Sequence, residues 1–321
     1  IRGWFYALLG SGVVNRGKSP YKAVMMHGYF TDEKGEKMSK SLGNYVPLEE
    51  ILDRTSVDTF RFWGLQNIPW KDIRFNWNEL GDIKRFLIIT LNLINYMKRF
   101  YVKPEGEVEL EEEDRWILGR LRKVRDEVTS GFEALEFYRG ARALRQFIVE
   151  DLSRFYMKLA KKRVSEGRNA EAVHHTLYKV LRTVSILMAP YVPHIAEHMH
   201  REFFMKFGDV PSVHMMDWPE VDVEVDENLD REFEMVMEVV GGIGAARNQA
   251  GVKMRWPLRA SAVVVSEPWM EKACLRLSRV IEDLANVKKL QVFTDPSAVD
   301  FSKRYDVKIM DGKVLVSIDG E

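Results

Sequence analysis

The sequence predicts a mainly α-helical protein with smaller α/β parts toward its two ends. Apolar residues recur every three or four positions almost continuously from Glu79 to about Phe207, which is the pattern of amphipathic helices. Before that stretch, a helix-like segment precedes a strand-like apolar run, and after it the run ASAVVV precedes a further helix and short strands. These three observations predict an α/β segment, a helix bundle and a small α+β module, in that order.

Length and composition exclude several classes of protein. The 321 residues suggest two or three domains, and Lys plus Arg and Asp plus Glu both number 48, so a nucleic-acid surface would need an uneven charge distribution. The single cysteine, Cys274, excludes an internal disulfide framework and a multi-cysteine zinc site, and fits a reducing cytoplasm. No apolar run reaches the roughly 18 to 20 residues that span a bilayer, so no membrane partner is expected. The chain begins at Ile1 within a helix-like segment, and we expect a piece of a larger protein.

The first elements alternate between helix and strand. Residues 3–14 read as a buried helix and residues 21–30 as a buried strand that ends near Gly28. A turn follows, with Gly35 where a positive φ is needed. Pro47 can begin a short helix over 48–54, and Ser56 can cap a second helix through residues 57–63, whereas residues 70–80 have no firm assignment.

Two apolar stripes define the longest helices of the bundle. The first comprises Phe86, Ile89, Leu93, Met97 and Phe100, and the second comprises Ala141, Leu144, Ile148, Leu152, Phe155 and Leu159. An acidic linker (104–114) lies between them, and its end can open a helix, where negative charge suits the positive end of the helix dipole. Further helices over about 169–189 and 194–207, separated by two prolines, complete an up-and-down bundle.

The last region combines helices with short strands. An acidic run (220–234) leads into a helix to about Gln249, followed by a strand over 260–265 and a helix around 269–285. Short strands are expected near 287–293, 305–310 and 313–318, with Asp311 and Gly312 as the turn between the last two.

Two short motifs match functional patterns by accident in our interpretation. HIAEH (194–198) has the spacing of an inverted zinc-peptidase helix, but it offers no identifiable third ligand and begins at a helix end, so no metal site and no zinc are expected. GGIGA (241–245) lacks the third glycine of a dinucleotide fingerprint and indicates only a close approach or a bend of a helix.

The stretch GEKMSKSLGN, residues 35–44, is the strongest candidate for chemistry. Lysines supply compact positive charge, serines supply hydroxyls, and glycines let backbone amides approach an anion, so the loop is suited to phosphate. On composition alone, a solvated hairpin end is the simpler interpretation, because short Lys/Ser/Gly clusters are common in turns.

Several segments in order resemble the C-terminal half of a class I aminoacyl-tRNA synthetase. They are RGWFY (2–6), PYKAVMMHGYF (20–30), KMSKSLGNYV (37–46), VDTFRFW (57–63) and APYVPHIAEH (189–198). GWFY, PWKDIRFNW, KMRWPL and the leucine at position 42 are most similar to isoleucyl-tRNA synthetases of the archaeal and eukaryotic type. At 57–63 the family usually carries Ala-Asp-Ala-Leu-Arg, of which this chain keeps Asp58 and Arg61.

The resemblance implies roles for named residues around ATP. Lys37 and Lys40 would stabilise the negative charge that grows on the leaving pyrophosphate while isoleucine attacks the α-phosphate. The other implied ATP-binding residues are His27, Gly28, Tyr29, Met38, Ser39 and Ser41. Gly43 and Asn44 would shape the end of the loop, and Trp4 would wall the isoleucine side-chain pocket. The implied cofactor of the intact enzyme is ATP with Mg²⁺.

The resemblance also implies a division of the chain. It comprises the C-terminal part of a Rossmann catalytic domain with its KMSKS loop (1–47), a stem-contact segment (48–80), an anticodon-binding helix bundle (81–220), and a connecting helix with an α+β module (221–321). The family's other ATP motif is absent, so we expect this Rossmann-fold remnant to be inactive alone. The implied partners are isoleucine and tRNA(Ile), and the implied state is a monomer. A stand-alone tRNA-binding module and a valyl or leucyl relative remain alternatives.

Charge distribution offers a separate prediction about RNA. Residues 114–168 carry 14 Lys or Arg against 8 Asp or Glu, although the whole chain is neutral. Some of these cations lie off the second apolar stripe, so their heads should reach solvent, where phosphate could meet them. They are Arg142, Arg145, Lys158, Lys161 and Lys162. The alternative is a solvated basic face that merely balances neighbouring carboxylates.

Overall fold

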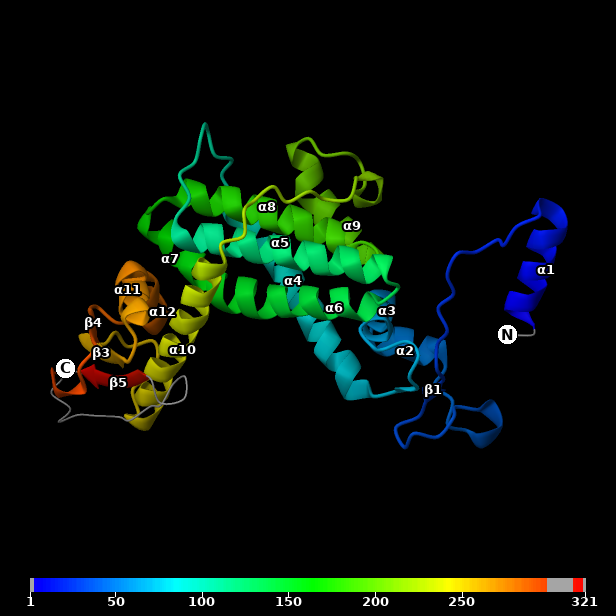
Figure 1. Ribbon diagram of the computed structural model, residues 1–321, viewed down its shortest axis with the longest axis horizontal. Helices are drawn as coiled ribbons and strands as arrows, with labels where there is room; N and C mark the ends of the chain where they lie inside the picture. Colours follow the sequence, from blue (N-terminus) through cyan, green and yellow to red (C-terminus); the bar gives the residue numbers. More distant parts are fainter. Residues whose placement is uncertain (1–2, 299–313, 320–321) are drawn as a thin grey trace.

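The computed structural model describes residues 3–298 and 314–319, and it is mainly helical. Figure 1 shows three parts along the longest axis, with helix α1 at one end, the helix bundle in the middle and the small β3–β5 sheet at the other end. The predicted mainly α architecture with small α/β parts is confirmed. In the described ranges, no helix combines the length and apolar character needed to cross a bilayer.

The N-terminal part contains less regular structure than the sequence predicts. Helix α1 (Trp4–Arg16) forms and ends at Gly17 in the left-handed conformation, but none of its residues is buried, so the predicted buried helix is wrong in its burial. The predicted buried strand is also wrong, because only β1 (Phe30–Thr31) is a strand and most of residues 21–29 are exposed. A buried strand needs neighbours on both sides. In the described chain, β1 pairs in parallel with β2 (Ile73–Arg74), and on its other side it has only an isolated antiparallel bridge between Thr31 and Lys37.

The next two helices form where their capping residues predict. Helix α2 (Leu48–Arg54) begins directly after Pro47. Helix α3 (Val57–Leu65) is capped by the Ser56 hydroxyl, which accepts the backbone N–H of Thr59. Both predictions are confirmed, and Gly35 has the positive φ expected of it, 88°.

The helix bundle follows the predicted stripes closely. Its helices are α4 (Trp77–Phe100), α5 (Glu112–Glu133), α6 (Phe137–Gln146), α7 (Met157–Glu166), α8 (Ala170–Met188) and α9 (Pro193–Glu202). A π-helical segment (Phe147–Tyr156) joins α6 to α7, so the two continue as one helical run. Every residue of the second stripe is buried, whereas Phe100 at the end of the first is 45% exposed.

The C-terminal module is a three-stranded sheet with helices beside it. Helix α10 (Glu227–Gln249) ends at the predicted residue, and β3 (Ala260–Val265) matches its predicted bounds. The sheet has the order β4-β3-β5, in which β4 (Leu290–Phe293) is parallel to β3 and β5 (Val314–Asp319) is antiparallel to it.

One predicted helix of this module is in fact two. Helix α11 (Pro268–Arg276) and helix α12 (Ser278–Ala285) are separated at Leu277, whose φ and ψ are not helical. The predicted strand near 305–310 and its turn at Asp311 and Gly312 lie outside the described residues.

Candidate functional site

Asn44 organises the loop that carries the two candidate catalytic lysines. Its side-chain amide donates to the Asp32 carboxylate at 3.0 Å and to the Lys37 carbonyl at 3.3 Å, while its side-chain oxygen accepts the Ser39 N–H at 2.8 Å. The Asn44 hydrogen bond, together with the backbone N–H groups of the turn, lowers the pKa of the Asp32 carboxyl. The loop is therefore held at both ends by one side chain.

The two serines of the loop bond to each other and to its backbone. Ser39 Oγ and Ser41 Oγ lie 2.8 Å apart, and Ser39 Oγ also accepts the Ser41 N–H, which caps a single 3₁₀ turn over Lys40–Leu42. Gly43 ends that turn with φ of 69°, a conformation that favours glycine. The short turn keeps the lysine and the hydroxyls on one compact loop.

Neither loop lysine has a carboxylate partner among the described residues. Lys37 Nζ lies 4.4 Å from the centroid of the Tyr29 ring, and Lys40 Nζ lies 5.5 Å from that of Tyr45. A cation–π contact at an exposed site contributes only about 0.5 to 1 kcal/mol, so a phosphate oxygen can displace either ring. The loop therefore presents two available positive charges.

A cavity of about 340 Å³ adjoins Lys37. Its walls are mostly apolar and come from the loop, from β1, and from helices α2 and α3. The lining residues are Tyr29, Phe30, Lys37, Met38, Tyr45, Val46, Leu48, Ile51, Phe60 and Phe75. The cavity combines an apolar interior with a cationic rim, which suits a ligand with an apolar body and an anionic end.

The segment predicted to border adenine is held against residues 69–73. Gly28 donates its N–H to the Pro69 carbonyl at 2.8 Å, and a β-carbon at this position would lie 2.5 Å from the Lys71 carbonyl. Tyr29 donates its N–H to the Asp72 carboxylate at 2.8 Å, while the His27 ring is exposed. The roles of His27, Gly28 and Tyr29 toward ATP stay predictions, as do those of Met38, Ser39 and Ser41.

Trp4 is not enclosed in the described structure. Its side chain is 69% exposed, and its ring contacts the Phe5 ring edge-on. Figure 1 shows α1 standing apart from the bundle. Its role in an isoleucine pocket therefore stays a prediction.

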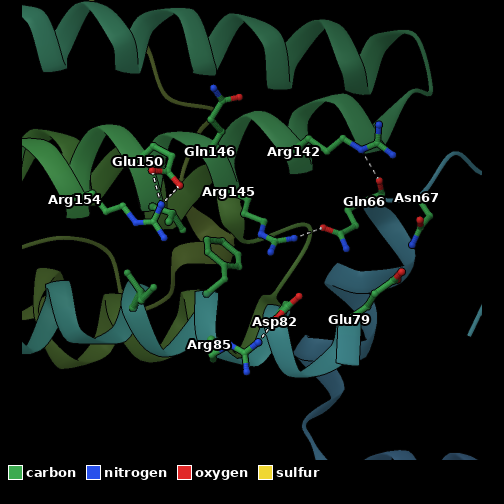
Figure 2. A pocket seen from close by; sticks show the side chains of 13 residues that line it. Gln66, Asn67, Glu79, Asp82, Arg85, Arg142, Arg145, Gln146, Glu150 and Arg154 are labelled. Carbon is green, nitrogen blue, oxygen red and sulfur yellow. Dashed lines mark hydrogen bonds and ion pairs between the residues drawn. The ribbon is translucent and has the colours of Figure 1, made fainter. Parts of the chain in front are cut away.

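A second cavity, of about 810 Å³, lies between α3 and α4 on one side and α6 with its π-helical extension on the other. Figure 2 shows that arginines from both sides line it. Arg154 is paired with Glu150 at 2.6 Å, and Arg85 is paired with Asp82. By contrast, Arg142 donates to the Gln66 carbonyl at 2.9 Å and Arg145 donates to the Gln66 side-chain oxygen at 3.2 Å.

The difference between these arginines decides which of them can bind an anion. Arg142 and Arg145 form no ion pair within the described residues, so phosphate would meet unneutralised guanidinium groups there. The sequence predicted both arginines but missed Arg85 and Gln66. Gln66 is 76 positions from Arg142, and such residues meet only through the fold.

The predicted lysines do not form one face with these arginines. Lys162 donates to the Asp283 carboxylate at 2.6 Å while its side chain is 38% exposed, so its charge is already paired and its role toward RNA stays a prediction. The Asp283 side chain is only 9% exposed, and a buried carboxylate needs a cation beside it. Lys158 is exposed, and Lys161 is exposed with its Nζ 5.7 Å from the Tyr96 ring. Sixteen residues of helix separate Lys158 from Arg142, which is roughly 24 Å along the axis.

The HIAEH segment has a structural role that its sequence does not reveal. Asp58, 2% exposed, lies 2.9 Å from His194 Nδ1 and accepts the Ile195 N–H at 2.7 Å. Glu197 accepts the Ser212 hydroxyl and the Val213 N–H. Within the described residues, no group of three His, Cys, Asp or Glu side chains is placed to hold a metal ion.

Two models of known protein families match this chain, one over the loop and one over the bundle. A family model described as tRNA synthetases class I (I, L, M and V) matches residues 1–76, which include the loop. A model described as the anticodon-binding domain of tRNA ligase matches residues 114–263, which include most of the bundle and α10.

Curated relatives extend over nearly the whole chain. Isoleucine–tRNA ligase of Pyrococcus abyssi is 39% identical over 90% of this chain, and that of Methanopyrus kandleri is 40% identical over 91%. The chain spans only 28% of the length of each of these relatives.

Two solved structures share the fold. A leucyl synthetase from Agrobacterium radiobacter K84, in a ternary complex with tRNA and LeuAMS, aligns with a TM-score of 0.52 at 18% identity, over 68% of this chain and 27% of that one. Mycobacterium tuberculosis methionyl-tRNA synthetase aligns with a TM-score of 0.50 at 16% identity, over 64% of this chain and 44% of that one. With the ordered motifs, the free loop lysines and the two family matches, these findings show that the chain belongs to the class I aminoacyl-tRNA synthetases and resembles the archaeal isoleucine–tRNA ligases among them.

Proposed function

We propose that this chain is the part of an isoleucine–tRNA ligase that carries the KMSKS loop and the anticodon-binding helices. The intact enzyme would activate isoleucine with ATP and Mg²⁺ and transfer it to tRNA(Ile) in the cytoplasm, as a monomer. The single observation that carries the proposal is the 39% identity to curated isoleucine–tRNA ligases over 90% of the chain. The division at residues 47, 80 and 220 belongs to the same proposal.

The geometry of the loop supports a role in pyrophosphate departure. Among the described residues, Lys37 and Lys40 have no carboxylate partner, and Asn44 fixes the loop backbone, so no described anion competes for the two charges. When the isoleucine carboxylate attacks the α-phosphate, the bond to pyrophosphate breaks and negative charge accumulates on the leaving oxygens. A lysine that meets those oxygens stabilises the transition state more than the bound ATP. The weak contact of Lys40 Nζ with the Tyr45 ring, at 5.5 Å, supports this role because a phosphate oxygen can displace it.

The test of this role is Lys40→Ala in a full-length ligase that contains this chain. We expect the rate constant of adenylate formation to fall by roughly 2 to 4 kcal/mol of transition-state stabilisation, with a much smaller change in ATP affinity. Lys34→Ala is the matched control, because Lys34 lies in the same hairpin but outside the motif. A Lys40 variant with weakened ATP binding and an unchanged rate constant would show that the loop only positions ATP.

Binding of tRNA is the activity that this chain can be tested for directly. We expect its affinity for tRNA to fall steeply with salt, and Arg142→Gln with Arg145→Gln to reduce the logarithmic slope by roughly two. Arg154→Gln is the control from the same cavity, because its charge is already neutralised by Glu150. If the double variant keeps the parent slope, the RNA backbone lies on another surface.

A further inference from the structure

The C-terminal module contains a turn whose backbone is held by several hydrogen bonds. Residues 253–256 form the turn, with the Trp256 N–H donating to the Lys253 carbonyl at 3.0 Å. Three carbonyl groups of the turn accept hydrogen bonds from side chains elsewhere in the module. Arg247 donates to the carbonyls of Lys253 and Trp256, and the Asn286 amide donates to that of Met254 at 2.9 Å.

Arg247 is the centre of this arrangement. It is 1% exposed, and its second terminal nitrogen donates to the carbonyls of Ala285 and Asn286 at 2.9 and 2.7 Å. None of its four acceptors is a carboxylate, so a buried cation is committed entirely to holding backbone. The hydrogen bonds of Arg247 therefore hold the backbone of the turn against the end of α12.

The turn presents an indole ring to solvent. Trp256 is 61% exposed, and its ring contacts no other described aromatic ring or cation. The backbone is hydrogen-bonded on both sides of the ring, because the Trp256 N–H donates to the Lys253 carbonyl and the Leu258 N–H donates to the Asn286 carbonyl. A rigid, unpartnered aromatic face loses little conformational entropy when a flat group stacks on it.

The surroundings of Trp256 are strongly basic. The exposed cations in this corner of the module are Lys253, Arg255, Arg259, Lys288 and Lys289. None of them forms an ion pair within the described ranges, and the sequence has no Asp or Glu between Asn248 and Ser266. Backbone pairing brings the two groups together, since Lys288 donates its N–H to the Leu258 carbonyl at 2.9 Å. Glu282, on neighbouring α12, bonds to the Leu290 N–H instead.

We propose that Trp256 is a stacking platform for an unpaired nucleotide base of the bound RNA, with Lys253, Arg255 and their basic neighbours contacting the flanking phosphates. This inference rests on the proposed tRNA-binding function and adds a named contact to it. Single-stranded RNA is recognised by aromatic rings on which splayed bases stack, combined with cations along the backbone. A partner protein or an acidic surface would satisfy the cations but would not require a fixed, isolated indole.

The experiment measures binding of a tRNA(Ile) transcript to the chain across salt concentrations. Trp256→Ala should weaken binding about tenfold and leave the salt slope unchanged, because a stack carries no charge. Trp256→Phe should retain part of the affinity. Lys253→Gln with Arg255→Gln should instead reduce the slope by roughly 1 to 1.5, as expected for two phosphate contacts to a single strand. A blunt RNA duplex, which has no unpaired base, should bind Trp256→Ala and the parent equally.

Two controls keep the outcomes separate. Leu275→Ala removes an apolar side chain that is 58% exposed in the same module, and it should change neither affinity nor slope. Trp256→Ala retains the backbone groups that Arg247 and Lys253 bind, so its unfolding temperature should match that of the parent. If the parent does not bind tRNA, the proposed function fails. If the parent binds and Trp256→Ala binds equally well, or loses no more than Leu275→Ala, the stacking platform is overturned while the proposed function stands.

Discussion

Residues 3–45 expose most of their apolar side chains, whereas the helix bundle buries most of the apolar side chains of its stripes. Between residues 3 and 45 only Thr31 is buried, although the segment is rich in aromatic and aliphatic side chains, and Tyr6 and Val14 are 73% and 86% exposed. In the bundle, the apolar stripes are almost completely buried. Apolar side chains on a helix contribute stability only when something covers them, so the first region has local structure with little tertiary stabilisation. Under the proposed function, the remaining catalytic domain would cover it.

The most direct test of this contrast applies one substitution to both regions. Leu177→Ala, on α8 and 0% exposed, should destabilise the chain by about 2 to 5 kcal/mol, because it removes buried methyl groups and leaves a cavity. Leu9→Ala, on α1 and 38% exposed, should cost less than about 0.5 kcal/mol. Urea unfolding followed by far-UV circular dichroism compares them. Similar losses would mean that α1 is covered in solution.

A second test addresses the connection between the regions. Asp58→Ala should cost about 1.5 to 3 kcal/mol, because it leaves the buried Ile195 N–H without its charged acceptor and frees His194. Asp53→Ala is the control, since Asp53 lies on α2 and is exposed. The measurement is again the unfolding midpoint. If Asp58→Ala unfolds like Asp53→Ala, α3 does not depend on the start of α9.

A third test measures how the stability of the bundle core depends on pH through the buried carboxyl of Glu113. Burial raises the pKa of Glu113 from its usual 4.5 to about 7, although Arg163 opposes this and Asp114 and Glu111 add to it. A raised folded-state pKa means that the folded protein binds the proton more tightly than the unfolded chain. Stability from that proton is therefore complete below pH 4.5 and is lost as the pH rises through 7.

Glu113→Gln keeps the neutral form at every pH. We expect it to be more stable than the parent by roughly 1 to 2 kcal/mol at pH 8, with a difference less than half as large at pH 5. The control is Glu133→Gln, an exposed residue near the end of the same helix. Thermal unfolding at the two pH values decides the matter, and a parent that is the more stable protein at pH 8 would show that the ion pair with Arg163 outweighs desolvation.

The smallest effect on global stability is expected at Gly28, where the N-terminal part contacts residues 71–74. Gly28→Ala places a methyl group against the Lys71 backbone, so residues 28–31 must move away from residues 71–74. Amide exchange should accelerate in residues 28–44, while the free energy of unfolding of the bundle changes by less than about 0.5 kcal/mol. Gly10→Ala is the control, because a β-carbon there meets no neighbour within 4 Å. Unchanged exchange in the Gly28 variant would mean that this attachment is dispensable.

Sequence reasoning succeeded where local signals and burial agree. The caps at Pro47 and Ser56, the end of α10 at Gln249 and the bounds of β3 all follow from residues within one or two turns. It failed for residues 21–30, whose apolar character predicts a covered strand but does not say whether the covering strands are in the chain.

The candidate site was predictable only in part for a related reason. The KMSKS loop is recognisable from its composition and from its resemblance to a family. The ion-pair partner of Lys162, by contrast, is 121 residues away and cannot be found from the local sequence. Likewise, the Gln66 contacts of Arg142 and Arg145, and the four carbonyls around Arg247, exist only after the fold has formed. Periodicity identifies which face a side chain occupies, but it carries no information about what lies opposite.

Helix α3 connects the bundle to the segment that carries the lysines. Asp58 and Arg61 fasten α3 to residues 190–195, with the Arg61 guanidinium donating to the Pro190 and Tyr191 carbonyls. On its opposite side, α3 bears against β1 through Phe30, which stacks on Trp63 at 5.7 Å between ring centroids. Helix α3 is thus joined to the bundle on one side and to β1 on the other. The lysine-bearing segment is connected to the bundle by two routes, through α3 and through the pairing of β1 with β2, so a change in α3 alone leaves the second attachment in place.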